Sequence, residues 1–199
     1  MTNHAAILQK TGEFAVSLTS QNDAAHDGDH ILRVVGLVRT LCRACPQADA
    51  FRAELLAWLH DLSDDKLASN ICLPSVAAFL RSISVPEEDI RFVEEGIPYI
   101  SYRKHPSLSP EVPLEIRIVQ DADRIDAMGA VGIARTFAYG GAKNRSLADS
   151  LTHFDEKLLL LYDLLSTEEA KRLALPRYNF LKAFYNQYKL ESSTGNGLR

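Results

Sequence analysis

The sequence predicts an all-α protein that folds as a single-domain helical bundle over residues 1–190. Apolar residues recur three and four positions apart through most of the chain, as on one face of an α-helix. No alternation of apolar and polar residues long enough to indicate a strand is present. The 199-residue chain is 46% apolar, which is enough for one core. The polar segment 191–199 is expected to be a disordered tail.

The first part of the chain divides into helices separated by proline and polar residues. An amphipathic pattern begins at Ile31 and stops near Pro46, because proline lacks the N–H that a helix interior needs. Acidic residues follow Pro86, where the first turn of a helix favours negative charge. The other predicted helices cover residues 7–18, 50–60, 74–83, 86–96 and 114–128, and the proline-rich segment 97–113 is expected to be a long loop.

The second part is expected to be helical as well. The segment GAVGIARTFAYGG, residues 129–141, either continues the preceding helix or kinks it. Residues 146–165 form a helix with a solid apolar stripe. The last helix starts with Ser166 or Thr167 as its N-cap, and Pro176 is expected to bend or split it.

Charge and composition exclude several classes of protein. The 22 Lys and Arg residues against 26 Asp and Glu give a net charge of −4, so there is no general electrostatic reason to bind nucleic acid. The sequence shows no signal peptide. It also shows no apolar run near the length of about 20 residues that a membrane span needs, so the chain is expected to be cytoplasmic. Cys42 and Cys45 form one isolated CxxC, which favours packing residues over a zinc or redox site.

Two histidine motifs lie where predicted helices begin and end. His60 and Asp61 close an apolar helix, either as ligands of a metal ion at its open end or as a histidine near the helix dipole beside an exposed acid. His26 and His30 are one helical turn apart, and His30 starts the face that continues into the core. A buried histidine without a ligand role is the alternative for His30.

A third cluster lies in IRIVQDADRIDAMGAVGIAR. Asp121, Asp123 and Asp126 interrupt an apolar pattern, although aspartate is a weak helix former and is rarely buried without a partner. Asp121 directly follows the apolar run, so a cation or Arg124 is its expected partner. A surface face with Asp–Arg pairs is the alternative. Facing helices of a bundle are a known place for metal sites.

Three segments together resemble the HD-domain superfamily of metal-dependent phosphohydrolases. They are HILRV at His30, LLAWLHDLSDDK at His60 and Asp61, and IVQDADRIDAMGAVGIARTF at Asp121. The pattern is similar to a small bacterial branch that includes nucleotide pyrophosphohydrolases, and the likeness covers residues 25–141. The resemblance implies a helical bundle of the HD type.

The resemblance also implies a site for one divalent metal ion. Its ligands would be His30, His60, Asp61 and Asp121. A mixed imidazole and carboxylate set accepts manganese, magnesium, iron, nickel, cobalt or zinc, so the metal is not distinguished. Such a metal polarises a phosphoryl group and lowers the pKa of water.

Other candidate residues surround these ligands in the sequence. The predicted catalytic residues are Asp64, Asp65 and Lys66. One of the acids would orient or deprotonate water, and Lys66 would hold a phosphate oxygen. The predicted substrate-binding residues are His26, Asp27, Arg124, Arg135 and Lys143, with ordinary surface charges as the alternative. A basic and aromatic set in the loop fits either a nucleotide or a plain solvated loop: Tyr99, Tyr102, Arg103, Lys104 and His105.

These motifs predict a metal-dependent phosphohydrolase that acts on a small nucleotide and releases pyrophosphate from a nucleoside triphosphate. A nucleotide monophosphatase or phosphodiesterase on the same site is the alternative, because a fold does not choose between these reactions. A ligand-sensing domain without turnover is a further alternative, and the presence of all four implied ligands favours catalysis. The expected partner is a small nucleotide, with no nucleic acid and no membrane, and the chain is expected to be a monomer or a homodimer.

Overall fold

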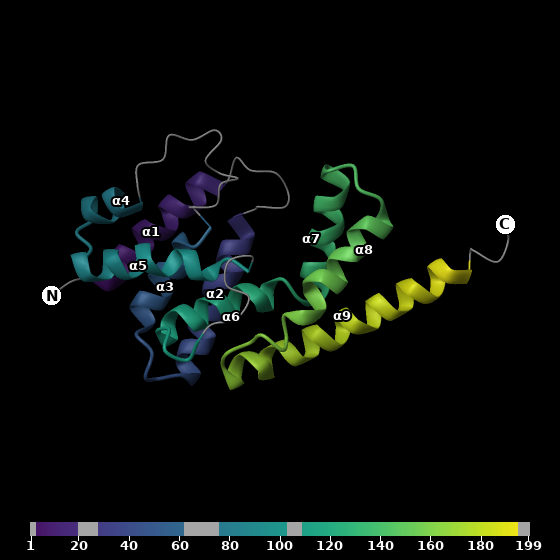
Figure 1. The fold of residues 1–199 in the computed structure, drawn as a ribbon. Helices are drawn as coiled ribbons and strands as arrows, with labels where there is room; N and C mark the ends of the chain where they lie inside the picture. Colours follow the sequence, from purple (N-terminus) through teal and green to yellow (C-terminus); the bar gives the residue numbers. More distant parts are fainter. Residues whose placement is uncertain (1–2, 20–27, 62–75, 103–108, 195–199) are drawn as a thin grey trace. The chain divides into compact units, whose positions relative to one another are not determined.

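The computed structural model describes residues 3–19, 28–61, 76–102 and 109–194 (Figure 1). Within these ranges the regular elements are helices and no strand occurs, so the predicted all-α class is confirmed. The helices are α1 (His4–Thr19), α2 (Gly28–Ala44), α3 (Ala50–Leu59), α4 (Val76–Ser82), α5 (Glu87–Ile100), α6 (Leu114–Asp126), α7 (Gly129–Ala142), α8 (Leu147–Glu156), the 3-10 helix η1 (Leu158–Leu160) and α9 (Glu168–Thr194).

The chain divides into two compact units, Met1–Asp123 and Arg124–Arg199. The single domain expected over residues 1–190 spans both units. Residues 191–194 of the expected tail belong to α9, and residues 195–199 lie outside the described part of the chain.

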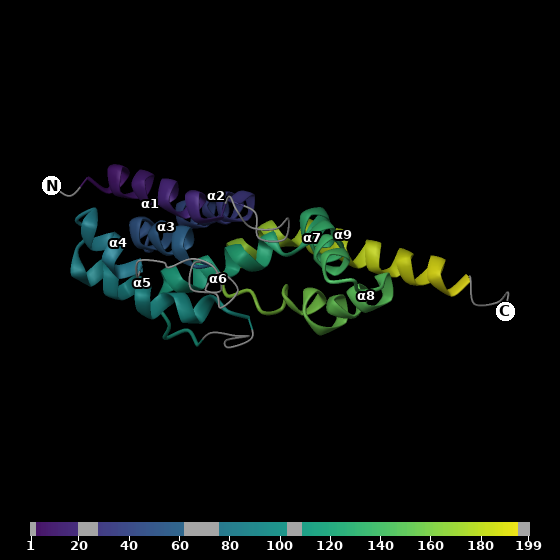
Figure 2. The same ribbon diagram turned by 90° about the horizontal axis from the view of Figure 1, so that it is seen from above.

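Helix α3 is the centre of the unit Met1–Asp123. Its residues are buried without interruption from Ala53 to Leu59, so it presents no solvent face over that length. It contacts α1, α2 and α5, and Figure 2 shows it between α1 and α5. A helix that is apolar around its circumference is stable only when neighbours cover every side, as they do here.

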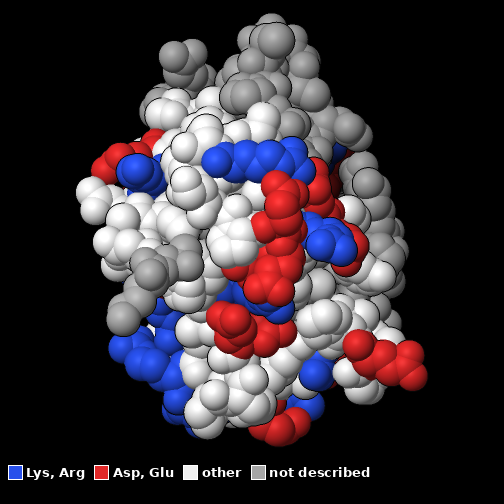
Figure 3. All heavy atoms as spheres, turned by 90° about the vertical axis from the view of Figure 1, so that its left-hand side faces the viewer, with Lys and Arg blue, Asp and Glu red and all other residues white. Residues whose placement is uncertain are grey.

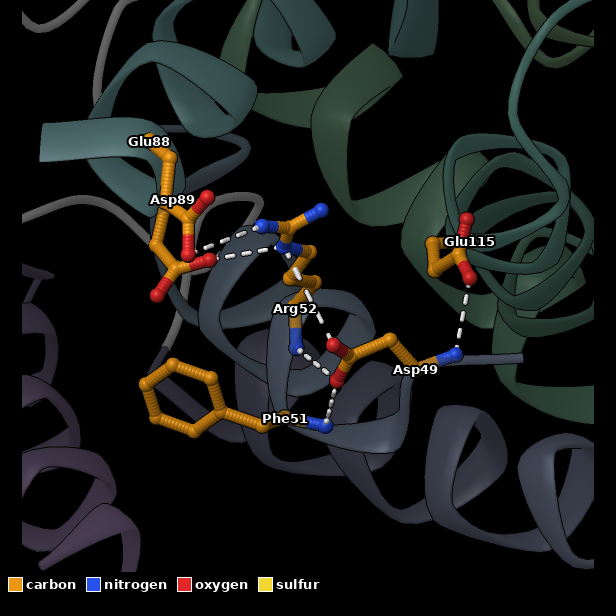
Figure 4. Close-up of polar contacts among 6 residues, drawn as sticks. All are labelled: Asp49, Phe51, Arg52, Glu88, Asp89 and Glu115. Atoms are coloured by element: carbon orange, nitrogen blue, oxygen red, sulfur yellow. Dashed lines mark hydrogen bonds and ion pairs between the residues drawn. The ribbon is translucent and has the colours of Figure 1, made fainter. Parts of the chain in front are cut away.

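The start of α3 is fixed by a network of polar contacts (Figure 4). The Asp49 carboxylate caps the helix by accepting hydrogen bonds from the backbone N–H groups of Phe51 at 3.0 Å and Arg52 at 3.1 Å. Glu115 of α6 accepts from the Asp49 N–H at 2.7 Å, and Arg52 Nε donates to Asp89 of α5 at 2.6 Å. Helix α3 is therefore held to α5 and α6 at its first turn.

The unit Arg124–Arg199 is built around aromatic side chains of α7, α8 and α9. Arg177 Nη1 of α9 donates to the Ile125 carbonyl at 2.9 Å and fixes α9 against the end of α6. Gly129 starts α7 at a positive φ of 74°, a conformation that favours glycine. The rings in contact are Phe137, Phe154, Phe184, Tyr185 and Tyr188.

The structure corrects the expected loop 97–113 and decides between the two readings of 129–141. Helix α5 continues through Pro98 to Ile100, because Ile97 and Ile100 are buried and hold the last turn in the core, while Pro98 is exposed. Residues 103–108 lie outside the described part. The chain breaks between α6 and α7, so 129–141 belongs to a separate helix rather than to a continuation of α6.

The expected helix over 146–165 is also shorter than predicted. Helix α8 ends at Glu156, Lys157 leaves the helical conformation with φ −140° and ψ −61°, and η1 follows. In α9, Thr167 Oγ1 accepts from the Ala170 N–H at 3.3 Å, so Thr167 acts as the N-cap. Helix α9 continues across Pro176 instead of splitting there.

On the face shown in Figure 3, acidic and basic side chains lie next to each other, and neither sign covers the surface. Bidentate pairs of this kind include Arg81 with Glu87, at 2.6 and 3.0 Å. No helix in the described ranges is both long and apolar enough to span a membrane.

Candidate metal centre

Two histidines and a carboxylate meet in the unit Met1–Asp123, where α2 begins and α3 ends. His30 lies in the first turn of α2, His60 is the C-cap residue of α3, and Asp61 follows it. One possible ligand atom from each lies within 4.8 Å of the others. Among the residues that the structure describes, no other group of three or more His, Cys, Asp and Glu side chains has this spacing.

The orientation of His60 is set by its own helix. His60 Nδ1 lies 2.8 Å from the Ala57 carbonyl oxygen. Because a carbonyl oxygen only accepts hydrogen bonds, Nδ1 carries a proton, and in the neutral form of the ring Nε2 is the nitrogen with the lone pair. His60 Nε2 is buried and has no hydrogen-bond partner in the described part of the chain, and it lies 3.4 Å from Asp61 Oδ1.

His30 lies on the other side of Asp61. Its side chain is only 4% exposed, and its ring contacts the His60 ring edge-on with 5.5 Å between centroids. His30 Nε2 lies 3.4 Å from Asp61 Oδ2. The two Asp61 oxygens therefore face one histidine each, and the Asp61 side chain is 35% exposed, which leaves the cluster open on one side.

Asp123 of α6 contacts the same cluster. Its Oδ1 lies 3.4 Å from His30 Nε2. Burial alone would raise the pKa of Asp123, but the hydrogen bond from His30 and the charges of His30 and His60 outweigh burial and the opposing charge of Asp61. The net effect holds the pKa of Asp123 below its ordinary value, so it is a carboxylate at neutral pH.

Asp121, the fourth predicted ligand, is not a member of this cluster. Its side chain is fully buried on α6. Residues two positions apart on an α-helix point about 200° away from each other, so Asp121 and Asp123 face opposite sides of α6. Asp123 lies beside His30, so Asp123 joins the predicted Asp121 as a candidate for the carboxylate that α6 contributes.

The predicted phosphate-binding cations of α6 and α7 have internal contacts in the unit Arg124–Arg199. Arg124 is buried, and its Nη1 donates to the Leu164 carbonyl. Arg135 Nη1 pairs with the buried Asp126 at 2.9 Å. Lys143 is exposed at the end of α7, with Nζ 5.7 Å from the centroid of the Tyr139 ring.

Several predicted residues lie outside the described part of the chain. They are His26, Asp27, Asp64, Asp65, Lys66, Arg103, Lys104 and His105. Of the two loop tyrosines, Tyr99 belongs to α5 and its carbonyl accepts a hydrogen bond from Gln120 Nε2 at 2.8 Å, and Tyr102 follows α5.

The CxxC pair at the end of α2 has the character of packing residues. Cys42 is buried, and burial, followed by the neighbouring Cys45 and the nearby acids, raises the pKa of its thiol to about 11. A thiol that is protonated at neutral pH is a poor nucleophile and a poor metal ligand.

The donor set of the cluster fits a divalent cation. The buried His60 Nε2 has no hydrogen-bond partner among the described residues, and a buried polar atom of this kind is normally paired. Its Nδ1 is held by a backbone carbonyl, as is usual for histidines that bind metals. Imidazole nitrogen together with carboxylate oxygen suits borderline and hard divalent cations.

No family model matches the chain. The chain is 36% identical over 178 residues to YpgQ of Bacillus subtilis, an uncharacterized protein, with 86% of each protein covered. A solved structure of B. subtilis YpgQ in complex with ADP has a TM-score of 0.77 and 33% identity, covering 92% of this chain and 97% of that chain. An HD-superfamily hydrolase from Bacillus thuringiensis has a TM-score of 0.71 and 32% identity, covering 96% of this chain and 99% of that chain.

The helical fold and the His–His–Asp cluster define an all-α protein similar to HD-superfamily structures. The expected resemblance is thus confirmed at the level of the fold. Given the identity over most of both proteins, the chain belongs to the family of B. subtilis YpgQ.

Proposed function

We propose that this chain is a divalent-metal-dependent phosphohydrolase that acts on a small nucleotide. The observation that carries the proposal is His60 Nε2, which is buried without a hydrogen-bond partner among the described residues and lies in a cluster with His30 and Asp61. Two likenesses support it. A relative in the same family binds ADP, and a structural neighbour is an HD-superfamily hydrolase.

In this proposal His30, His60, Asp61 and Asp123 hold the cation. Asp123 takes the place of Asp121 in this proposal, because Asp123 Oδ1 lies 3.4 Å from His30 Nε2. Asp121 is two positions away on α6, which turns it by about 200° from Asp123. When bound, a divalent cation would polarise a phosphoryl group and make water acidic enough to serve as a nucleophile near neutral pH. The Ala57 carbonyl keeps the His60 ring turned with Nε2 toward the cluster.

The proposed reaction is hydrolysis of a nucleoside triphosphate between its α- and β-phosphates. The oxygen of water joins the α-phosphorus, the bridging P–O bond breaks, and the products are a nucleoside monophosphate and pyrophosphate. Asp64 and Asp65 are proposed to orient or deprotonate the water and Lys66 to hold a phosphate oxygen. His26, Asp27, Arg124, Arg135 and Lys143 are the proposed substrate contacts.

A product assay tests the reaction. The purified chain is incubated with a panel of nucleoside mono- and triphosphates, with Mn²⁺ or with EDTA, and the products are separated by anion-exchange chromatography. The proposal predicts monophosphate and pyrophosphate with metal and no product with EDTA.

Two other outcomes contradict it. Release of orthophosphate instead of pyrophosphate identifies a monophosphatase or another phosphohydrolase on the same site. Binding of nucleotide without turnover of any member of the panel identifies a ligand-sensing domain.

A further inference from the structure

The two helices that carry the cluster pack largely through apolar side chains. Helix α2 buries Val34, Val38 and Leu41, and α3 buries its apolar residues on every side. Apolar attraction is roughly proportional to buried area and has little directional preference. The position of α2 along α3, on which the cluster depends, is therefore set by interlocking side chains and by directional polar contacts between the two helices.

A bidentate ion pair links the two helices. Arg39 of α2 donates from Nε to Glu54 Oε2 of α3 at 2.9 Å, and from Nη2 to Glu54 Oε1 at 2.6 Å. Glu54 is only 8% exposed although it carries a charge. A fork-to-carboxylate pair of this kind has a defined geometry as well as a favourable energy.

The same carboxylate is tied to the last turn of α3 and through it to α1. Trp58 Nε1 donates to Glu54 Oε1 at 3.4 Å. Gly12 of α1 lies against the Trp58 ring so closely that a Cβ at this position would be 3.0 Å from a ring carbon. Contacts from α1 and α2 thus meet at the turn of α3 that leads into His60.

The dimensions connect this pair to the cluster. At about 1.5 Å of rise per residue, Arg39 lies about 13 Å along α2 from His30, and Glu54 lies about 9 Å along α3 from His60. A shift of α2 by one helical turn would move His30 by about 5.4 Å. That is larger than the 4.8 Å within which the ligand atoms of the cluster lie.

We infer that Arg39 and Glu54 are positioning residues, whose ion pair sets the register of α2 on α3 and so brings His30 to His60 and Asp61. The inference rests on the proposed metal site for its consequence in binding, but the juxtaposition of the two histidine rings is a property of the chain alone. The pair is half-buried, with the Glu54 side chain 11% exposed and the Arg39 side chain 56% exposed. Polar side chains that specify register between apolar helices have precedent in coiled coils.

The experiment compares Arg39→Met and Arg39→Lys with Arg81→Met as the matched control. Arg81 makes an equally bidentate pair with Glu87, but that pair joins α4 to α5 and not the helices of the cluster. Titration with Co²⁺ gives the dissociation constant and the visible absorption spectrum of the bound ion. Thermal unfolding in EDTA gives the stability of each variant separately.

The inference predicts that Arg39→Met binds Co²⁺ about tenfold more weakly and with an altered absorption spectrum. Removal of a group that positions metal ligands commonly weakens metal binding to this extent. Arg39→Lys keeps the charge but loses the fork, so it restores binding only in part. Arg81→Met binds like the wild type. An Arg39→Met protein with a lower melting temperature but an unchanged dissociation constant and spectrum would overturn the inference.

A metal-free readout separates this inference from the proposed function. In the wild type and in Arg81→Met, nuclear Overhauser contacts between the His30 and His60 rings are expected, and they should weaken in Arg39→Met. If the wild type binds no Co²⁺, the proposed metal site is wrong. The contacts between the His30 and His60 rings then decide by themselves whether Arg39 positions α2 on α3. Unchanged contacts in Arg39→Met refute the inference, and Glu54→Gln serves as the second variant if Arg39→Met does not fold.

Discussion

Replacing His60 by leucine tests whether the buried histidine serves a ligand rather than the fold. The change removes Nε2, a buried nitrogen that no hydrogen bond satisfies in the described part of the chain. It also removes the hydrogen bond between Nδ1 and the Ala57 carbonyl at 2.8 Å. Leucine is close to histidine in size, so little cavity is left behind.

The two effects of this substitution on the stability of the metal-free protein have opposite signs. Leaving a buried polar atom unsatisfied costs about 1–3 kcal/mol, which His60→Leu recovers. The lost hydrogen bond costs about 0.5–1.5 kcal/mol. The free energy of unfolding in EDTA is therefore expected to change by between about −0.5 and about +2.5 kcal/mol. Most substitutions at a residue that is only 6% exposed would lower it.

The metal-bound protein behaves in the opposite way. At a metal concentration of about 100 times the dissociation constant, binding stabilises the wild type by about 2.7 kcal/mol. For a chain of this size that corresponds to a rise in melting temperature of about 5–11 °C. Since His60→Leu removes a ligand, its melting temperature should be the same with Mn²⁺ and with EDTA.

Differential scanning calorimetry with Mn²⁺ and with EDTA measures both effects. His153→Leu is the control, because His153 lies in α8 of the other unit and is not a member of the cluster. This control should keep the full rise with Mn²⁺. The reasoning is refuted if His60→Leu keeps the rise, or if it loses several kcal/mol of stability in EDTA.

Three further outcomes follow from the structure. Asp123→Asn should weaken Mn²⁺ binding by at least about a hundredfold in calorimetric titration, with little loss of stability. Asp121→Asn should retain Mn²⁺ binding but have a lower melting temperature, because Asp121 is fully buried. Loss of binding in Asp121→Asn alone would contradict this assignment. Gly36→Ala should raise the free energy of unfolding, measured in urea, by about 0.5–1 kcal/mol, because an added Cβ meets nothing within 4 Å there. Gly132→Ala should lower the free energy of unfolding by about 1–3 kcal/mol, because its Cβ would lie 2.0 Å from a backbone oxygen. Equal effects of the two substitutions would refute the packing argument. Burial raises the pKa of the Cys42 thiol to about 11 in the folded chain, so the unfolded chain loses this proton first. As the pH rises from about 9 to about 11, the wild type should therefore lose about 2 kcal/mol of stability relative to Cys42→Ala. A constant difference in urea unfolding would show that the thiol is not perturbed.

Helical spacing accounts for most of what the sequence predicted correctly about the fold. The amphipathic pattern after Ile31 and the apolar run into His60 became α2 and α3, because packing of a periodic apolar face is what stabilises a helix. The helix boundaries that differed depend on tertiary packing. Pro98 is tolerated in α5 because the last turn buries Ile97 and Ile100, and the burial of distant partners is not visible in a local pattern.

The sequence predicted Asp121 as the second acid of the candidate site, whereas the structure has Asp123 beside His30. His30 was recognisable because it begins the inward face of α2, and the structure brings it to His60 and Asp61. The choice between Asp121 and Asp123 depends on which side of α6 faces the end of α3. Helix α6 is buried on several sides, at Ile118, Val119 and Ala122 among others, so its periodicity does not distinguish the two acids.

The most direct test of the account is the position of the cation itself. Crystals grown with Mn²⁺ and measured at the manganese absorption edge give an anomalous difference map that locates the ion without reference to activity. The account predicts a peak among His30, His60, Asp61 and Asp123, within ligand distance of His60 Nε2. A peak beside Asp121, a peak elsewhere in the molecule, or no peak at this cluster would contradict it.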